Sequence, residues 1–321
     1  MAERVFTSMG AVHAEASVVT IGAFDGVHRG HQHILRLARD RATALGARLV
    51  VVTFEPLPGQ VFAPDRFPGR VVTNARRREL LEARGADVIV ELPFSLEMAK
   101  ETAEEFMAEL AGIGPVRELW IGSDFALGHK RLGTASRLAE IGEPLGIDVR
   151  AVPRVDLGGE DLSSTAIRRA IAAGQADVAA RRLGHRFRVE GTVEHGAQIG
   201  RQIGFPTANV TPPVGLVALP DGIYATLAWV AGEHTVYPAM TYIGTRPALN
   251  TGQRAIETHL FDFDGDLYGR TLVTEFVQHL RPDANFPSVE ALVEQLGRDE
   301  EMARTVLAPV LQERVSTGLA R

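Results

Sequence analysis

Two histidines after a glycine-rich turn near the start of the chain are placed to bind a phosphate group. The stretch from Gly22 reads Gly-Ala-Phe-Asp-Gly-Val-His-Arg-Gly-His and ends at His31. His28 and His31 are three residues apart, so at a helix start both imidazoles can face one side, and Gly30 leaves the approach open. The unpaired N–H groups and the dipole of a helix start favour an anion. We therefore predict a phosphate site.

Two other interpretations of this stretch remain. A strand, a glycine turn and a helix are common in α/β domains, and histidines beside such a turn often have no function. Metal ligation would need a third ligand at matching spacing, and none is evident in the sequence. The His-x-Gly-His spacing is what favours phosphate over both.

A second cluster of polar residues begins another predicted helix. Ser163, Ser164 and Thr165 are followed by Arg168 in the first turn, and the helix ends at Gly174. A plain N-cap is one interpretation, because Ser and Thr are common caps. A cation in the first turn opposes the helix dipole, and a bound anion would resolve that conflict. This favours a second helix start that contacts phosphate.

Hard oxygen ligands occur together in the second half of the chain. Gly204-Phe-Pro forms a turn, and Thr207 and Asn209 follow it two residues apart, so their side chains can face the same way. Such ligands suit a magnesium ion carried on a nucleotide. A polar turn with a side-chain-to-backbone bond is the alternative.

A carboxylate lies in the middle of a later predicted strand, 256–261. Alternation places Glu257 and His259 on the face opposite Ile256, Thr258 and Leu260. A glutamate on such a strand is often simply exposed to solvent, and the pattern alone leaves this alternative open.

These residues lie on two differently patterned halves. Up to residue 182, short apolar runs alternate with helical patterns, which predicts an α/β domain with a parallel sheet covered on both faces. Its loops at the carboxyl ends of strands are where such sheets bind ligands. The predicted strands are 18–21, 48–54, 87–91, 119–122 and 147–152, and Asn74 is predicted to cap a helix that ends at Gly85.

From residue 183 to the end at 321 the pattern becomes short alternating strands separated by Gly, Pro and Asp, which predicts a small antiparallel β-barrel or sandwich. A final helix capped by Ser288 follows. Its apolar stripe is expected to pack on the barrel and comprises Val289, Leu292, Val293 and Leu296.

Composition narrows the class of protein. With 321 residues the chain has room for two domains, and a net charge of −6 without a basic patch argues against a nucleic-acid partner. The absence of cysteine excludes disulfides, thiolate nucleophiles and Cys-ligated zinc. The beginning does not resemble a signal peptide, and apolar runs are too short to span a bilayer. We expect a cytoplasmic protein with no membrane partner.

The first half resembles the adenylyltransferase module of bacterial FAD synthetases, a Rossmann-like nucleotidylyltransferase domain. The resemblance rests on the glycine-rich stretch, Thr53-Phe-Glu-Pro, Gly122-Ser-Asp-Phe and Ser163-Ser-Thr-Ala-Ile-Arg. It implies that His28 and His31 bind ATP phosphates and stabilise the transition state, with Asp124 and Phe125 near the substrates. The implied nucleotide-binding residues are Gly22, Phe24, Asp25, Gly26, Gly30, Ser163, Ser164, Thr165 and Arg168.

The second half resembles the riboflavin kinase module, which follows that domain in bacterial enzymes. The resemblance rests on residues 204–209, 256–261 and 280–288. It implies that Thr207 and Asn209 are Mg–ATP ligands and that Glu257 is the general base. Residues implied near the substrate are Gly204, Phe205, Pro206, Arg281 and Phe286.

Together these resemblances imply a bifunctional enzyme that makes FMN from riboflavin and FAD from FMN, with ATP as co-substrate and Mg²⁺ as cofactor. One alternative is a nucleotidylyltransferase for another phosphorylated metabolite, with the barrel as a flavin-binding appendage. Another is a non-catalytic flavin sensor. Formation of a homo-oligomer is left open. The sequence departs from the family pattern at Leu57, Ala166, Tyr242 and Asn285.

Overall fold

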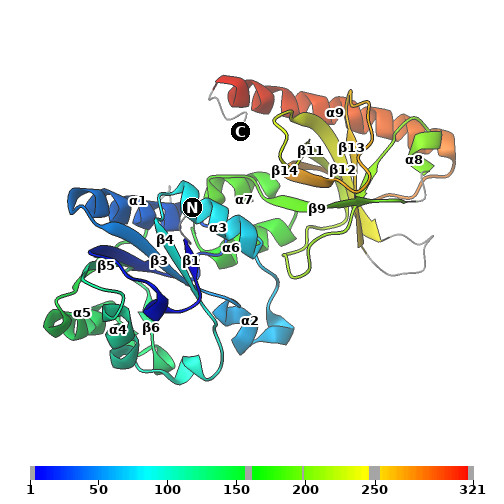
Figure 1. Ribbon diagram of the computed structural model, residues 1–321. Coiled ribbons are helices and arrows are strands. Elements are labelled where there is room, and N and C mark those ends of the chain that lie inside the picture. The colour runs from blue at the N-terminus through cyan, green and yellow to red at the C-terminus, as the bar shows by residue number, and fades with distance from the viewer. Residues whose placement is uncertain (1–3, 156–160, 197–198, 246–253, 317–321) are drawn as a thin grey trace. The chain divides into compact units, whose positions relative to one another are not determined.

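A six-stranded parallel sheet organises the first part of the chain (Figure 1). The computed structural model describes residues 4–155, 161–196, 199–245 and 254–316. The strand order is β1-β4-β3-β2-β5-β8, and every neighbouring pair is parallel. The strands are β1 (Val5–Phe6), β2 (Ser17–Ile21), β3 (Arg48–Phe54), β4 (Val88–Leu92), β5 (Val116–Gly122) and β8 (Asp148–Val152).

Helices cover the sheet, and Figure 1 shows α1 and α4 on opposite sides of it. The longer ones are α1 (Arg29–Ala44), α2 (Pro58–Phe62), α3 (Asn74–Ala83), α4 (Ala103–Ala111) and α5 (Ala135–Gly142). The single-turn helices are η1 (Met9–Ala11), η2 (Pro64–Arg66), η3 (Met98–Lys100), η4 (His129–Arg131) and η5 (Glu143–Leu145). Strand β2 is buried along its whole length, as expected for a strand of a parallel sheet that is covered on both faces.

Two details differ from the sequence-based predictions in this part. Thr73, not Asn74, caps α3, because its hydroxyl accepts the N–H of Arg76 at 3.2 Å. The amide of Asn74 instead reaches Glu91 on the sheet. The loop after β5 also contains a two-stranded antiparallel ribbon, β6 (Ala126–Leu127) with β7 (Gly133–Thr134).

The second part is a closed antiparallel barrel, which confirms the predicted fold class and decides between barrel and sandwich. The strand order is β10-β13-β12-β11-β14-β9. The strands are β9 (Arg188–Glu194), β10 (Ala208–Val210), β11 (Gly222–Val230), β12 (Tyr237–Thr245), β13 (Arg254–Leu260) and β14 (Thr271–Pro282). The helices are α6 (Ser164–Ala172), α7 (Ala176–Leu183), α8 (Ile199–Gln202) and α9 (Val289–Ser316).

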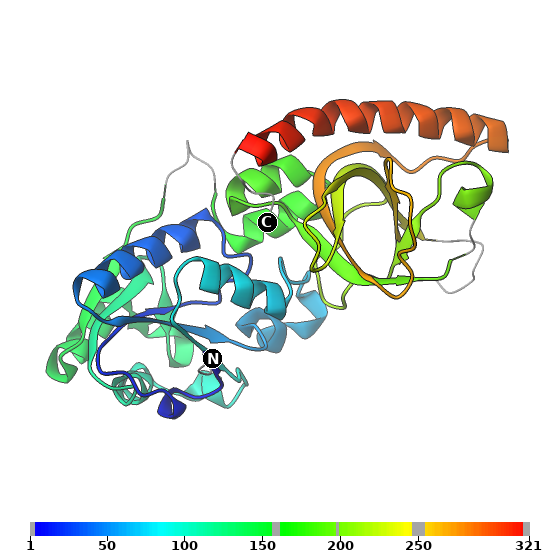
Figure 2. The same ribbon diagram turned by 45° about the horizontal axis from the view of Figure 1, so that its top comes forward.

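Helix α9 runs along the outer face of the barrel (Figure 2). Ala303 and Leu307 are buried there against apolar side chains of β11 and β12, including Leu227 and Met240. Ser288 begins the helix as predicted, since its hydroxyl accepts the N–H of Ala291. Val289 is 57% exposed, so the expected packing of this residue is wrong. It lies in the first turn, before the helix reaches the barrel core.

By internal contacts the chain divides into two compact units. The first is Met1–Phe67 with Val72–Ser164, and the second is Pro68–Val71 with Thr165–Arg321. The domain boundary between residues 182 and 183 stays a prediction. Within the described part of the chain, every helix is too short or too polar to span a bilayer.

Candidate active sites

The glycine-rich turn joins β2 to α1 through a backbone that few sequences can adopt. Gly26 has φ of 83°, and the non-glycine residues Phe24 and Val27 have φ of 48° and 40°. Positive φ values at such residues are strained and persist where the surroundings impose them. Phe24 and Asp25 are each 1% exposed, so burial helps to impose this conformation.

His28 and His31 lie together at the start of α1, as their spacing predicts. Their rings are stacked, with centroids 3.6 Å apart and an angle of 18° between the planes. His28 is the N-cap, and its Nδ1 accepts the N–H of His31 at 3.4 Å. The ring of Phe24 lies 5.0 Å from that of His31. The turn therefore presents two imidazoles and a helix start at one point.

Burial keeps both imidazoles neutral. It lowers the pKa of His28 from 6.5 to about 4, although Asp161 opposes the shift. Burial, with a smaller contribution from His28, holds the pKa of His31 well below its usual value. A neutral imidazole has one N–H donor, and an approaching phosphate would favour a second proton. Among the described residues no group of three or more His, Asp or Glu is placed to hold a metal ion.

The depressed pKa of His28 predicts a pH-dependent stability. Between pH 7.5 and 5.5 the unfolded chain protonates this histidine and the folded chain does not, so the free energy of unfolding falls as pH drops through 6.5. We expect His28→Asn, which keeps a capping acceptor, to reduce that fall by about 1 kcal/mol. Denaturant titrations followed by the fluorescence of Trp120, in a Trp229→Phe background, would measure it. An unchanged pH dependence would contradict the buried neutral state.

Of the hydroxyl residues Ser163, Ser164 and Thr165, Ser164 contacts the glycine-rich turn. Its hydroxyl donates to the carbonyl of Asp25 at 2.9 Å, and Ser163 precedes it. Thr165 and Arg168 belong to the second unit, where Nε of Arg168 donates to the carbonyl of Gly69 at 2.9 Å. Contact of these residues with a nucleotide stays a prediction.

Two loops at the carboxyl ends of β5 and β3 border the same edge of the sheet. Asp124 is exposed and pairs with Arg154 at 2.7 Å, and Phe125 packs partly against the core. Leu57, one of the departures from the family pattern, is 2% exposed. Its side chain therefore packs inside the protein and presents no donor to a ligand.

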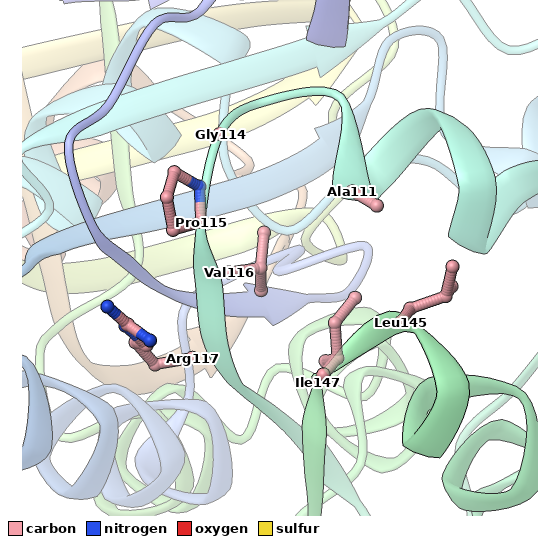
Figure 3. Close-up of a pocket in the computed structure, with 8 residues that line it drawn as sticks. Ala111, Gly114, Pro115, Val116, Arg117, Leu145 and Ile147 are labelled. Atoms are coloured by element: carbon pink, nitrogen blue, oxygen red, sulfur yellow. The ribbon is translucent and has the colours of Figure 1, made fainter.

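A hollow of about 380 Å³ lies at the opposite edge of the sheet (Figure 3). It is lined where β5 and β8 begin, whereas the histidines lie where β2 ends. Its lining residues are Ala111, Gly114, Pro115, Val116, Arg117, Leu145, Gly146 and Ile147. None of these side chains is a carboxylate, imidazole, thiol or hydroxyl, and Arg117 contributes only a positive charge, so the hollow is not a candidate active site.

The barrel brings a carboxylate and two oxygen ligands together on its outer face. The hydroxyl of Thr207 donates to Oε2 of Glu257 at 3.3 Å. Asn209 lies opposite Glu257 in the pairing of β10 with β13. All three side chains are half-buried, whereas the neighbours Thr258 and Leu260 are buried. The predicted alternation of β13 is thus correct, and Glu257 is grouped with the two predicted metal ligands.

The turn before Thr207 is held by contacts with a histidine of β13, His259. Gly204 has φ of 86°, as a tight turn requires. The ring nitrogen Nδ1 of His259 donates to the carbonyl of Pro206 at 2.7 Å, and the rings of His259 and Phe205 are 5.4 Å apart. Sequence reasoning gave His259 no role. Its position two residues after Glu257 on the same face was the available signal.

Arg281 and Phe286 lie at the junction of β14 and α9. Arg281 forms a bidentate ion pair with Asp299, whose side chain is fully buried, and its guanidinium lies 5.5 Å from the ring centroid of Phe286. Arg281 thereby ties α9 to the barrel. A contact of either residue with substrate stays a prediction.

The other departures from the family pattern fall in different surroundings. Tyr242 lies opposite Glu257 in the pairing of β12 with β13, and its hydroxyl donates to Asp283 at 3.1 Å. Burial raises the pKa of Tyr242 to about 12. Ala166 is buried, and Asn285 is exposed.

Comparison with known proteins gives consistent matches along the chain. A family model described as FAD synthetase matches residues 11–166, and one described as riboflavin kinase matches residues 183–307. A protein of Pseudomonas fluorescens, named bifunctional riboflavin kinase/FMN adenylyltransferase, is 40% identical over 91% of this chain and 93% of its own length. The protein of the same name from Escherichia coli K12 is 36% identical over 90% and 92%.

A solved structure has the same overall fold. It is described as a macrolide-efflux protein from Streptococcus pneumoniae, and it matches with a TM-score of 0.85 and 30% identity. The match covers 94% of this chain and 98% of that one. Both parts of the fold therefore occur together in another protein.

Proposed function

Because the chain belongs to the family of bifunctional riboflavin kinases/FMN adenylyltransferases, we propose that His28 and His31 serve adenylylation of FMN and that Glu257 serves phosphorylation of riboflavin. The enzyme is a transferase whose N-terminal part makes FAD and whose C-terminal part makes FMN. The observation that carries the assignment is the grouping of Glu257 with Thr207 in one part and the stacked histidines in the other.

Adenylylation needs positioning more than a protein nucleophile. A phosphate oxygen of FMN attacks the α-phosphorus of ATP, and the bond to the leaving pyrophosphate breaks. Negative charge grows on the phosphate oxygens, so donors aimed at them lower the barrier. His28 and His31 donate from their ring N–H groups, and the start of α1 adds backbone N–H groups.

Phosphorylation of riboflavin needs a base. As the terminal ribityl hydroxyl attacks the γ-phosphorus of ATP, its proton passes to a carboxylate oxygen of Glu257, and ADP leaves. The hydroxyl of Thr207 holds that carboxylate in place at 3.3 Å. The half-buried setting of Glu257 leaves it accessible to substrate.

Thr207 and Asn209 fit a magnesium ion bound with ATP. A hydroxyl and an amide oxygen are hard ligands, and both lie beside Glu257 on the same face of the barrel. When bound, the ion would neutralise charge on the transferring phosphates. The residues themselves orient the nucleotide toward the carboxylate.

Asn209→Ala is expected to raise the Mg²⁺ concentration for half-maximal FMN formation about tenfold, because one hard ligand is lost. Titrating Mg²⁺ at saturating riboflavin measures this. Thr211→Val is the matched control. Thr211 lies two residues after Asn209, and its hydroxyl donates to the carboxylate of Glu194. A magnesium dependence that is identical in Asn209→Ala and the wild type would remove Asn209 from the metal site.

The direct test of the proposed function is to incubate the purified protein with riboflavin and Mg–ATP and to separate the flavins over time. FMN is expected first and FAD next, with one pyrophosphate released for each FAD. Pyrophosphate release only with some other phosphorylated acceptor would favour a single-activity transferase. Tight flavin binding without turnover would favour a sensor. A cytoplasmic location and the absence of a nucleic-acid partner stay predictions, and the sequence and the comparisons leave the oligomeric state open.

A further inference from the structure

Arg77 of α3 is a cation whose side chain is 0% exposed, and neither resemblance assigned it a role. Burying a charge is costly unless it is paired and hydrogen-bonded. Nη2 of Arg77 donates to Oε2 of Glu55 at 2.9 Å and to Oδ1 of Asn74 at 2.7 Å. Glu91 lies 3.5 Å away and adds a second carboxylate. The charge is therefore compensated inside the first unit.

The second terminal nitrogen of the Arg77 guanidinium, Nη1, donates hydrogen bonds to backbone carbonyl groups. Nη1 of Arg77 donates to the carbonyl of Ala23 at 3.1 Å and to that of Phe54 at 3.0 Å. Ala23 lies just beyond β2 in the glycine-rich turn, and Phe54 ends β3. The hydroxyl of Thr53 donates to the same Ala23 carbonyl at 3.2 Å. A side chain that served only to pair charges would not need these two carbonyls.

Ala23 immediately precedes the strained part of the turn. Phe24 and Val27 hold left-handed φ values, and such values persist where the surroundings over-determine them. The ring of Phe24 contacts His31, which stacks on His28. A continuous set of contacts thus runs from Arg77 through the turn to the two imidazoles.

We propose that Arg77 is a positioning residue for adenylyl transfer, which fixes the glycine-rich turn so that His28 and His31 meet the nucleotide phosphates. The inference rests on the proposed role of these histidines. The neighbours on α3 differ from it, since Arg76 pairs with Glu79 near the surface and Arg78 pairs with Glu91. The helix turns only Arg77 of the three fully inward.

The test compares Arg77→Gln and Arg77→Lys with the matched control Arg76→Gln. The rate constant kcat for adenylylation of added FMN is expected to fall about a hundredfold in Arg77→Gln, as for a misplacement of about 1 Å. Arg77→Lys should be intermediate, because an ammonium group cannot reproduce the fork of four contacts. FMN formation by the barrel in the same preparation should stay unchanged, and Arg76→Gln should resemble the wild type.

A second readout separates positioning from stability. In histidine ring NMR titrations, Arg77→Gln should shift the resonances of His28 and His31 and raise the pKa of His28 toward 6.5, because a released turn exposes the rings. A role in stability alone would lower the melting temperature and leave these signals and kcat unmoved. That result, a parallel loss of FMN formation, or failure of both variants to fold would overturn the proposal. If His28→Ala kept full FAD formation, the proposed histidine role would fail, independently of the Arg77 result.

Discussion

Glu257→Gln is expected to abolish formation of FMN from riboflavin while added FMN is still converted into FAD. Glutamine keeps the size of the side chain and can still accept the hydroxyl of Thr207. It cannot take the proton from the attacking ribityl hydroxyl, and loss of a general base costs about 10²–10⁴-fold in rate. Initial rates of FMN formation from riboflavin, and of FAD formation from FMN, measure the two activities separately.

Glu194→Gln provides the matched control for this prediction. Glu194 lies on β9, opposite Asn209 on the other side of β10, and is exposed. The substitution changes the charge of the same region without removing the base. Equal losses in the two variants would indicate a general electrostatic effect, and retention of more than about a tenth of the rate in Glu257→Gln would rule out its role as base.

The parallel sheet could be predicted because its central strands β2, β3 and β4 are buried on both faces and its strands alternate with helices along the chain. The edge strand β1 could not, because Val5 and Phe6 form only a two-residue strand. These residues pair with Ile89 and Val90, which are more than 80 positions away, so the local sequence pattern does not indicate the strand. The cap of α3 was shifted by one residue because Thr73 and Asn74 are both good caps, and only the contact of Asn74 with the sheet distinguishes them.

The two candidate sites differ in how much of each is local. The histidine pair follows from a spacing of three residues at a helix start, so the sequence contains nearly all of its geometry. Thr207 and Glu257 are fifty positions apart in the sequence, and their proximity depends on the register of β10 against β13. Alternation predicted which face Glu257 occupies but not what lies beside it. The resemblance to riboflavin kinases supplied that pairing.

Arg77 shows what neither pattern nor resemblance supplied. It is the middle one of three consecutive arginines, and charged residues on a helix are usually exposed. Which of the three points inward depends on the phase of α3 against the sheet. That phase is set by Leu80 and Leu81, which are buried on the same helix. The burial of Arg77 beside the ends of strands can therefore be recognised from the three-dimensional structure and not from the sequence pattern.

His28→Ala is expected to abolish FAD formation while FMN accumulates from riboflavin. The variant loses the imidazole proposed to donate to the phosphates. It also loses the stacking on His31 and the N-cap acceptor of α1. Loss of one preorganised donor to developing charge costs about 10²–10³-fold in rate. Since FMN is made by the C-terminal part, the FMN formed in the same reaction mixture shows that the protein is folded and active.

His33→Ala is the control that isolates the imidazole at position 28. His33 lies on the same helix, and its ring contacts Arg36 at 3.3 Å on the exposed side. It should leave both activities near those of the wild type, because its ring is not part of the stacked pair. His28→Asn, which restores a capping acceptor but not the imidazole, should remain as inactive as His28→Ala. If His28→Asn recovered FAD formation, capping of α1 rather than phosphate contact would be the function of His28, and the nucleotide would have to be held by other groups.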